Sequence, residues 1–81
     1  MRVKVEYFAS MRDKLGVKEE IMELPDGSSV EDLIERVKER LGESFEGRVL
    51  VNGKSVESLK GFKTELKDGD VVSLFPPIAG G

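Results

Sequence analysis

The fold is decided by residues 29–42, which read SVEDLIERVKERLG. Ser29 and Asp32 have the spacing of a capping box at the start of a helix, and Gly42 suits its end. The polar face carries Asp32 and Arg36 at a spacing that predicts an i,i+4 ion pair. Apolar residues recur at helical spacing in this stretch, namely Val30, Leu33, Ile34, Val37 and Leu41. One amphipathic helix is therefore predicted, and it must pack its apolar stripe across a sheet.

Two strands and a short helix are predicted before this helix. Residues 2–8 alternate between apolar and charged side chains, which is typical of a half-buried strand. One or two helical turns follow, because Ser10 and Asp13 have capping-box spacing and Gly16 suits a helix end. Residues 18–24 alternate poorly, and this pattern favours a strand at the edge of the sheet.

Three further strands are predicted after the helix. Residues 48–51 run into Asn52-Gly53, which is a strong hairpin signal, and residues 54–56 return from that turn. Residues 71–75 form the last strand, which ends at Pro76-Pro77 because proline cannot donate a ladder hydrogen bond. The segment between the last two strands is predicted to be irregular and to reach the core through Leu59, Phe62 and Leu66.

This order of elements predicts an α+β fold, the ubiquitin-like β-grasp. The first and last strands are the most apolar, so they should lie in the middle of a mixed sheet of about five strands. The single long helix packs across that sheet, and its strand–helix–strand connection should be right-handed. We expect a β-grasp domain over residues 1–76 and a flexible C-terminal Gly-Gly tail over residues 77–81.

Composition excludes much chemistry. The chain has no Cys and no His, which removes disulfides, thiolate metal sites and the common nucleophile–base pairs. A formal net charge of −3 gives no electrostatic basis for binding nucleic acid. No apolar run approaches the roughly 20 residues that span a bilayer, so no membrane partner is expected and the expected location is cytoplasmic.

The body of the chain offers no convincing catalytic group. Asp68-Gly69-Asp70 resembles part of a calcium loop, but the residues after it supply no further oxygen ligand, so a plain turn is favoured and no metal site is expected. Tyr7 falls on the core-facing side of the first strand and is a poor candidate for a catalytic phenol. Whether the protein is itself an enzyme is left open at this point.

Two aromatic residues fit the core less well. If Val3, Val5 and Tyr7 point inward, Phe8 points outward, and Phe75 lies on the corresponding side of the last strand. Because the two strands are expected to be neighbours, both rings should lie on one outer surface near the tail. They could dock a partner or be covered by a loop, and we favour docking.

The last residues combine neutrality with slenderness. Residues 71–81, VVSLFPPIAGG, carry no charged side chain although 36% of the whole chain is charged. Pro76-Pro77 favours an extended backbone, and residues 76–81 can project about 20 Å at most. Gly80 and Gly81 can pass through a narrow channel, so the group delivered is the terminal carboxylate. A carboxylate becomes a reactive electrophile only after activation, for example as an acyl-adenylate.

The ending FPPIAGG, residues 75–81, resembles the MoaD/ThiS family of ubiquitin-like sulfur carriers. The resemblance covers the whole chain, including residues 8–9 (FA), 24–27 (LPDG), 51–53 (VNG) and 68–70 (DGD). The form FPP-x-x-GG is most similar to the MoaD branch, which holds the small subunits of molybdopterin synthase.

The resemblance implies that catalysis is supplied by other proteins. A ubiquitin-activating-like adenylyltransferase would use ATP and Mg²⁺ to adenylylate Gly81, and a sulfur donor protein would convert it to a thiocarboxylate. The tail would enter the large subunit of molybdopterin synthase, in a 2:2 heterotetramer, and give its sulfur to a cyclic pyranopterin phosphate. No cofactor is expected on this chain itself. The residues implied in contact with these partners are Phe8, Phe75, Pro76, Pro77, Ile78, Ala79 and Gly80.

Three alternatives share the same ending. The protein could be a ubiquitin-like modifier joined to lysines of other proteins through Gly81. It could carry sulfur for tRNA thiolation or thiazole synthesis. It could also be a β-grasp adaptor whose terminal glycines have no chemical role.

Overall fold

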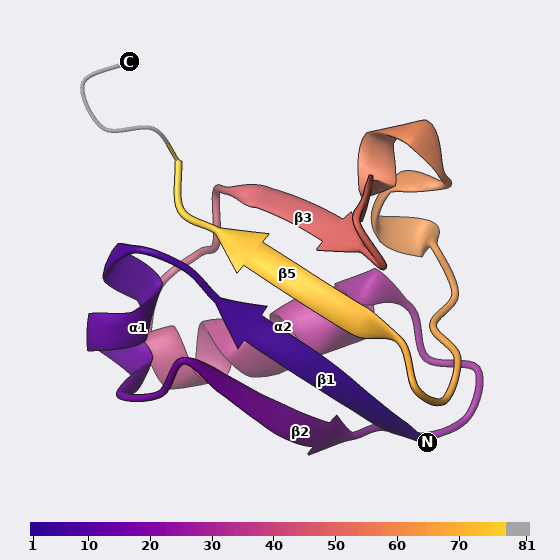
Figure 1. Ribbon diagram of the computed structural model, residues 1–81, viewed down its shortest axis with the longest axis horizontal. Coiled ribbons are helices and arrows are strands. Elements are labelled where there is room, and N and C mark those ends of the chain that lie inside the picture. The colour runs from indigo at the N-terminus through magenta and orange to yellow at the C-terminus, as the bar shows by residue number, and fades with distance from the viewer. Residues whose placement is uncertain (78–81) are drawn as a thin grey trace.

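The computed structural model describes residues 1–77 and consists of a mixed sheet with one long helix across one face (Figure 1). Four of the five residues of the predicted tail, Ile78, Ala79, Gly80 and Gly81, lie outside the described residues. The elements in chain order are β1 (Arg2–Tyr7), α1 (Ser10–Leu15), β2 (Glu19–Glu23), α2 (Val30–Leu41), β3 (Arg48–Val51), β4 (Lys54–Ser55), the 3-10 turns η1 (Val56–Ser58) and η2 (Gly61–Lys63), and β5 (Val71–Phe75).

The strand order confirms the predicted sheet. The order is β2-β1-β5-β3-β4, with β1 and β5 parallel in the middle and all other pairs antiparallel. The poorly alternating strand β2 lies at an edge, as expected. Asn52 and Gly53 close the β3–β4 hairpin with φ values of 51° and 82°, the left-handed conformation that a tight hairpin needs.

Helix α2 begins and ends as its sequence predicts. The Ser29 backbone N–H donates to the Asp32 carboxylate at 2.9 Å, and the Asp32 N–H donates to the Ser29 hydroxyl at 3.4 Å, which completes the capping box. The predicted Asp32–Arg36 pair is wrong, because this cap occupies the Asp32 carboxylate. Arg36 donates instead to the Glu23 carbonyl at 3.0 Å and so ties the helix to strand β2.

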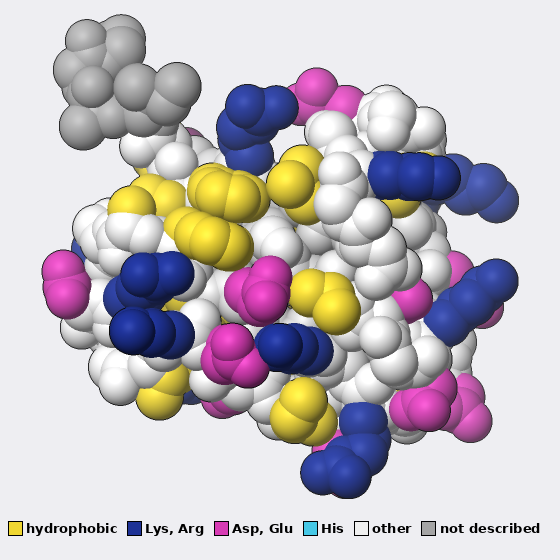
Figure 2. Space-filling model, in the orientation of Figure 1, with side chains coloured by type: hydrophobic (Ala, Val, Ile, Leu, Met, Phe, Trp, Pro, Cys, Tyr) yellow, Lys and Arg dark blue, Asp and Glu magenta, His cyan; other side chains and the backbone are white. Residues whose placement is uncertain are grey.

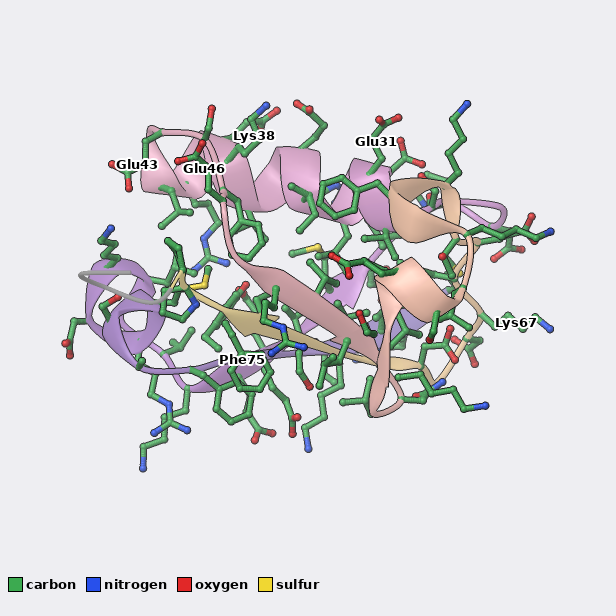
Figure 3. All side chains as sticks on the ribbon, turned by 90° about the horizontal axis from the view of Figure 1, so that it is seen from above. Glu31, Lys38, Glu43, Glu46, Lys67 and Phe75 are labelled. Carbon is green, nitrogen blue, oxygen red and sulfur yellow. The ribbon has the colours of Figure 1, made fainter. Side chains whose placement is uncertain are left out.

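The apolar stripe of α2 and the face of the sheet beneath it form the core. Val3, Val5, Val72 and Leu74 on the sheet and Leu33 on the helix are all 0% or nearly 0% exposed. Figure 3 shows α2 on one side of the sheet and Phe75 projecting from the other side. The two faces of the sheet therefore have different surroundings, and the outer face is free of any helix among the described residues.

Two local predictions are wrong. The predicted capping box of Ser10 and Asp13 does not form, because α1 starts one residue earlier than it requires. Ala9 is the N-cap, with no side-chain capping hydrogen bond. Ser10 is thus already inside the first turn and cannot accept the bond that caps it.

The predicted core anchors Leu59 and Phe62 are also wrong, since these side chains are 40% and 42% exposed. The prediction for Leu66 is confirmed, since this side chain is buried. Two backbone hydrogen bonds hold its segment against the start of α2: the Leu66 N–H donates to the Ser28 carbonyl at 2.9 Å, and the Val30 N–H donates to the Thr64 carbonyl at 2.9 Å. The turns η1 and η2 bulge outward from these fixed points.

Candidate functional site

The two aromatic residues singled out in the sequence form a stacked pair on the outer face. The ring centroids of Phe8 and Phe75 are 4.3 Å apart, and the ring planes differ by 11°. The parallel register of β1 and β5 places them side by side, and the Phe8 N–H extends the ladder by donating to the Leu74 carbonyl at 3.1 Å. Both rings are half-buried. Stacked aromatic pairs of this kind supply a large and rigid apolar surface.

Cationic and apolar groups surround this pair. The Arg12 guanidinium lies 5.4 Å from the centre of the Phe8 ring, and its Nε donates to the Tyr7 carbonyl at 2.9 Å. Figure 2 shows hydrophobic side chains gathered on this face, with Lys and Arg side chains next to them. A groove of about 420 Å³ adjoins the pair and is lined by Ala9, Arg48, Leu50, Phe75, Pro76 and Pro77.

The structure brings together those predicted site residues that it describes. Phe8 stacks on Phe75, while Pro76 and Pro77 line the groove beside Phe75 and lead toward the end of the chain. The other predicted site residues, Ile78, Ala79, Gly80 and the reactive Gly81, lie outside the described residues, and their roles stay predictions. We call Phe8, Phe75 and the groove the docking face.

Sequence reasoning missed three contributors to the docking face. Arg12 reaches Phe8 only because α1 turns back over the end of β1, and Arg48 and Leu50 reach the groove through the β3–β5 pairing. Period-two alternation does place Leu50 on the outer face once the register is known. No local pattern in the sequence reveals the position of Arg12.

Below the aromatic pair the outer face changes from apolar to charged. Lys4 lies 3.2 Å from the Glu19 carboxylate and 3.8 Å from that of Glu6, and the Ser73 hydroxyl donates to Glu6 at 3.2 Å. The hydrogen bond to Glu19 and its negative charge raise the pKa of Lys4. One positive and two negative charges meet here, and each of these partly exposed pairs contributes little to stability.

The core face of the sheet carries a separate polar cluster. The Tyr7 hydroxyl donates to the Glu20 carboxylate, which also accepts from the Arg40 guanidinium at the end of α2. Burial, and then the bond to Glu20, raise the pKa of Tyr7 well above its usual range. The same carboxylate raises the pKa of Arg40. Tyr7 therefore keeps its proton at physiological pH and ties β1 to the helix, which confirms its predicted core-facing position.

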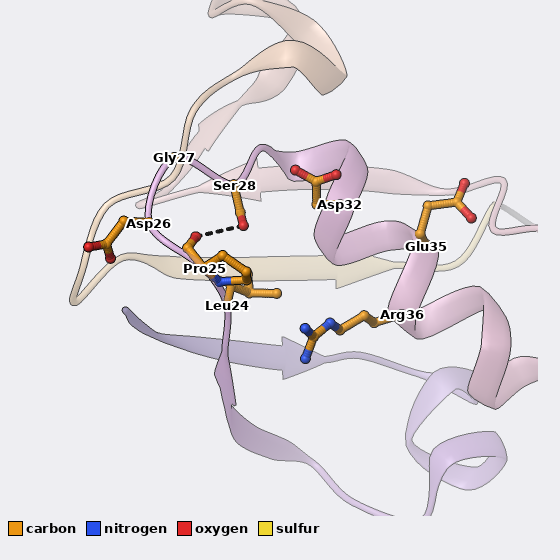
Figure 4. Close-up of a pocket in the computed structure, with 8 residues that line it drawn as sticks. All are labelled: Leu24, Pro25, Asp26, Gly27, Ser28, Asp32, Glu35 and Arg36. Atoms are coloured by element: carbon orange, nitrogen blue, oxygen red, sulfur yellow. Dashed lines mark hydrogen bonds between the residues drawn. The ribbon is translucent and has the colours of Figure 1, made fainter.

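A second depression, of about 520 Å³, lies elsewhere, at the turn before α2 (Figure 4). Among the polar side chains that line it, the Asp32 carboxylate is held in the capping box and Arg36 donates to the Glu23 carbonyl. The Ser28 hydroxyl donates to the Pro25 carbonyl at 2.7 Å. These groups are used to build the turn. Across residues 1–77, acidic side chains form no group of three that could hold a metal ion.

The predicted turn at residues 68–70 is also confirmed. Asp68 accepts from the Arg2 N–H at 2.7 Å and Asp70 accepts from the Lys67 N–H at 2.8 Å, so both carboxylates are hydrogen-bonded to backbone N–H groups.

No helix in the described part of the chain is both long and apolar enough to cross a membrane.

Comparison with known proteins identifies relatives of two kinds. The chain is 38% identical over 85 residues to the molybdopterin synthase sulfur carrier subunit of Chlamydomonas reinhardtii, with all of both chains covered. It is 36% identical over 92 residues to small archaeal modifier protein 3 of Haloferax volcanii, again with full coverage of both.

Solved structures of similar proteins share the fold of this chain. A structure from Pyrococcus furiosus, named as molybdopterin converting factor subunit 1, matches with a TM-score of 0.83 and 43% identity, covering 96% of this chain and 99% of the other. A further match is a chain from the complex of subunits 1 and 2 of the molybdopterin-converting factor from Helicobacter pylori, with a TM-score of 0.60, 27% identity and full coverage of both chains.

These likenesses confirm the ubiquitin-like β-grasp fold predicted from the order of elements. The model of the ThiS family matches residues 5–81, which is nearly the whole chain and includes the stacked pair and the residues that follow it. The chain belongs to the ThiS family.

Proposed function

We propose that this protein is a sulfur carrier that acts as the small subunit of molybdopterin synthase. The observation that carries the proposal is the position of the Phe8–Phe75 stack, directly at the base of the segment that ends in Gly80-Gly81. A partner that binds the stack has the end of the chain beside it. The similarity to a molybdopterin synthase sulfur carrier subunit along the whole chain supports this assignment.

The proposed chemistry takes place at the carboxylate of Gly81. An adenylyltransferase binds ATP and Mg²⁺, and the carboxylate attacks the α-phosphate and releases pyrophosphate. The donor protein then delivers sulfur at the sulfide level, which attacks the acyl carbon, displaces AMP and leaves a thiocarboxylate. This chain supplies the reacting carboxylate and the docking face, while all other catalytic groups belong to its partners. We place these steps in the cytoplasm, where thiols are kept reduced.

In the second stage the loaded chain binds the large synthase subunit, in a 2:2 heterotetramer. The complex of subunits 1 and 2 of the Helicobacter pylori factor supports the choice of partner. The thiocarboxylate sulfur attacks a side-chain carbon of a cyclic pyranopterin phosphate and displaces an oxygen leaving group from that carbon. Water then hydrolyses the resulting thioester, which leaves the sulfur on the pterin as a thiol and restores the Gly81 carboxylate. The neutral run from Val71 makes this insertion feasible, because uncharged residues are cheaper to desolvate.

Intact-mass spectrometry of the chain purified from its own cells tests the proposal. We expect a species heavier by the exchange of one oxygen for sulfur, and we expect that species to be consumed when the large synthase subunit and the cyclic pyranopterin phosphate are added. A chain lacking Gly81 is the matched control and should show neither change. An unmodified terminus in wild-type chain incubated with ATP, Mg²⁺, adenylyltransferase and sulfur donor would contradict the proposal.

A second candidate function, a ubiquitin-like protein modifier, is favoured by the 36% identity to small archaeal modifier protein 3. It uses the same activated Gly81 but transfers it to a lysine amine, with loss of AMP. The mass measurement separates the two, because a modifier appears in cell extract as conjugates with other proteins. Conjugates in place of a thiocarboxylate would select this second function.

A further inference from the structure

The C-terminal end of β5 touches the loop that joins α2 to β3 at one unusually close point. Gly47 lies in that loop, directly before Arg48, which pairs with Phe75. A Cβ atom placed on Gly47 would lie 1.7 Å from the Phe75 carbonyl oxygen and 2.8 Å from the Phe45 ring. Since real Cβ contacts are essentially never shorter than 3.0 Å, any side chain at position 47 must displace the Phe75 carbonyl, the backbone of position 47 or both.

Gly47 differs from the other glycines of residues 1–77. The others all have positive φ and open space where a Cβ would stand, so their role lies in the turn of the backbone: Gly16, Gly27, Gly42, Gly53, Gly61 and Gly69. Gly47 has no positive φ, and its need for glycine comes from the close approach of another strand. Among the described glycines, Gly47 is the one where the neighbouring backbone leaves no room for a side chain.

The contact is placed where a small shift is amplified. The Phe75 carbonyl belongs to the peptide bond that leads into Pro76, and Pro77 follows it. Proline rings fix φ near −65°, so Pro76 and Pro77 form a stiff, extended segment. Relieving the overlap of an added Cβ, from 1.7 Å to at least 3.0 Å, requires position 47 and the Phe75 carbonyl to separate by more than an ångström, and the part of this shift that falls on Phe75 reorients Pro76 and Pro77.

We propose that Gly47 is a positioning residue that sets the direction in which the C-terminal segment leaves the docking face. This inference rests on the proposed function. In this proposal the stacked rings bind the partner, whereas the Gly47–Phe75 contact sets the direction in which Pro76 and Pro77 leave the docking face. A misplacement of about 1 Å can reduce a reaction rate roughly a hundredfold, so delivery is sensitive to this contact even when docking is intact.

The test compares Gly47→Ala with Gly53→Ala, using the whole chain with the adenylyltransferase, ATP and Mg²⁺. Gly53 lies at the hairpin with φ of 82° and no atom within 4 Å of the position of an added Cβ, so its alanine variant strains the backbone at the end of the sheet opposite to Phe75. For Gly47→Ala we expect the rate of adenylylation at saturating enzyme to fall about tenfold to a hundredfold, with affinity for the enzyme changed less than about threefold. Gly53→Ala should lose stability and keep the wild-type saturating rate. A wild-type saturating rate for Gly47→Ala, or an equal loss in both variants, overturns the proposal.

Two further measurements keep the test decisive. If Gly47→Ala does not fold, Pro76→Gly makes the Pro76-Pro77 segment flexible and leaves position 47 unchanged. A wild-type saturating rate in that variant overturns the proposal. Carbon-detected NMR of residues 75–77 examines the geometry without any partner. Shifted signals there in Gly47→Ala are expected, and unchanged signals overturn the proposal. A wild-type chain that is never adenylylated contradicts the proposed function and leaves this geometric result standing.

Discussion

The two faces of the sheet are built from alternate residues of the same strands, yet their surroundings differ. On the face toward α2, Val5, Tyr7 and Leu74 are 0% exposed and fit against the helix. On the outer face, Phe8 and Phe75 are only half-buried and contact each other. The two-residue period thus separates the positions that build the core from the positions of the proposed docking face. Substitutions on the two faces should therefore affect different measurements.

The largest effect is expected on the core face, from Leu33→Ala in helix α2. Leu33 is fully buried against the sheet, and removing such a side chain leaves a cavity that typically costs about 2–5 kcal/mol. We expect a loss of this size in the free energy of unfolding, measured by urea denaturation followed by circular dichroism. The control is Ile21→Ala on the outer face, where the side chain is 53% exposed and the change should stay within about 0.5 kcal/mol. Equal losses in both would contradict the division between faces.

The second effect concerns the outer face and reverses this pattern. Phe75→Ala removes half of the stacked pair, and we expect the affinity for the large synthase subunit to fall by about 2 kcal/mol or more, roughly thirtyfold. Stability should fall less, by about 1 kcal/mol, because the ring is only half-buried. Titration calorimetry measures the affinity. Leu59→Ala is the control, because this exposed residue lies between η1 and η2 and does not line the groove of the docking face. Unchanged affinity in Phe75→Ala would show that the partner binds elsewhere.

The sequence predicted the core face better than the details around it. Alternation in β1 and β5, the helical stripe of α2 and the Asn52-Gly53 turn are signals within a few residues of one another, and all three are confirmed. Leu59 and Phe62 were misplaced because their burial depends on how a long loop is held. Long-range bonds between residues 64–66 and 28–30 decide that, and no local pattern reports them.

The candidate site shows the same limit. Phe8 and Phe75 could be paired from alternation and strand order alone, and their stacking confirms that step. The cation above Phe8 and the close approach of Gly47 depend on how α1 and the α2–β3 loop fold back, which neither spacing nor composition describes. The glycine directly before a strand was the one available hint, because such glycines often mark a close approach of another backbone.

The third prediction uses pH to examine the core face alone. Tyr7 is the single tyrosine of the chain, and burial raises its pKa above the usual value of about 10. The unfolded chain therefore loses this proton near pH 10 while the folded chain keeps it. The contribution to stability is complete below pH 10 and is lost above it, by up to about 1.4 kcal/mol for each pH unit.

Two measurements check this prediction. Ultraviolet titration should show phenolate only as the protein unfolds, and unfolding free energies between pH 9 and 11 should fall more steeply in wild type than in Tyr7→Phe. The variant keeps the raised pKa of Lys4 and therefore part of the slope, so the difference between the two slopes isolates the tyrosine. A phenolate signal near pH 10 from folded protein would show that the Tyr7–Glu20 contact does not hold.

The smallest effect is expected at Ala9, the residue that joins the two regions. It follows Phe8 of the docking face and starts the helix that brings Arg12 over that ring. Its φ of 51° with ψ of −133° lies in a region that favours glycine, and such strain costs about 1–3 kcal/mol. Ala9→Gly relieves the strain but adds freedom to the unfolded chain, which offsets about 0.5–1 kcal/mol. We expect a net gain of about 1 kcal/mol, seen as a higher melting temperature.

The Ala9 methyl group lines the groove of the docking face, but neither the stacked rings nor the Arg12 bond to Tyr7 uses it. We therefore expect affinity for the large synthase subunit to change by less than about 0.5 kcal/mol in Ala9→Gly. Gly16→Ala is the opposing control, since it introduces strain at a position with φ of 79° and should lower the melting temperature. A gain in stability accompanied by weaker binding would mean that the strain at Ala9 holds Phe8 and Arg12 in their binding positions. The docking face would then depend on the backbone turn between the two regions as well as on its own side chains.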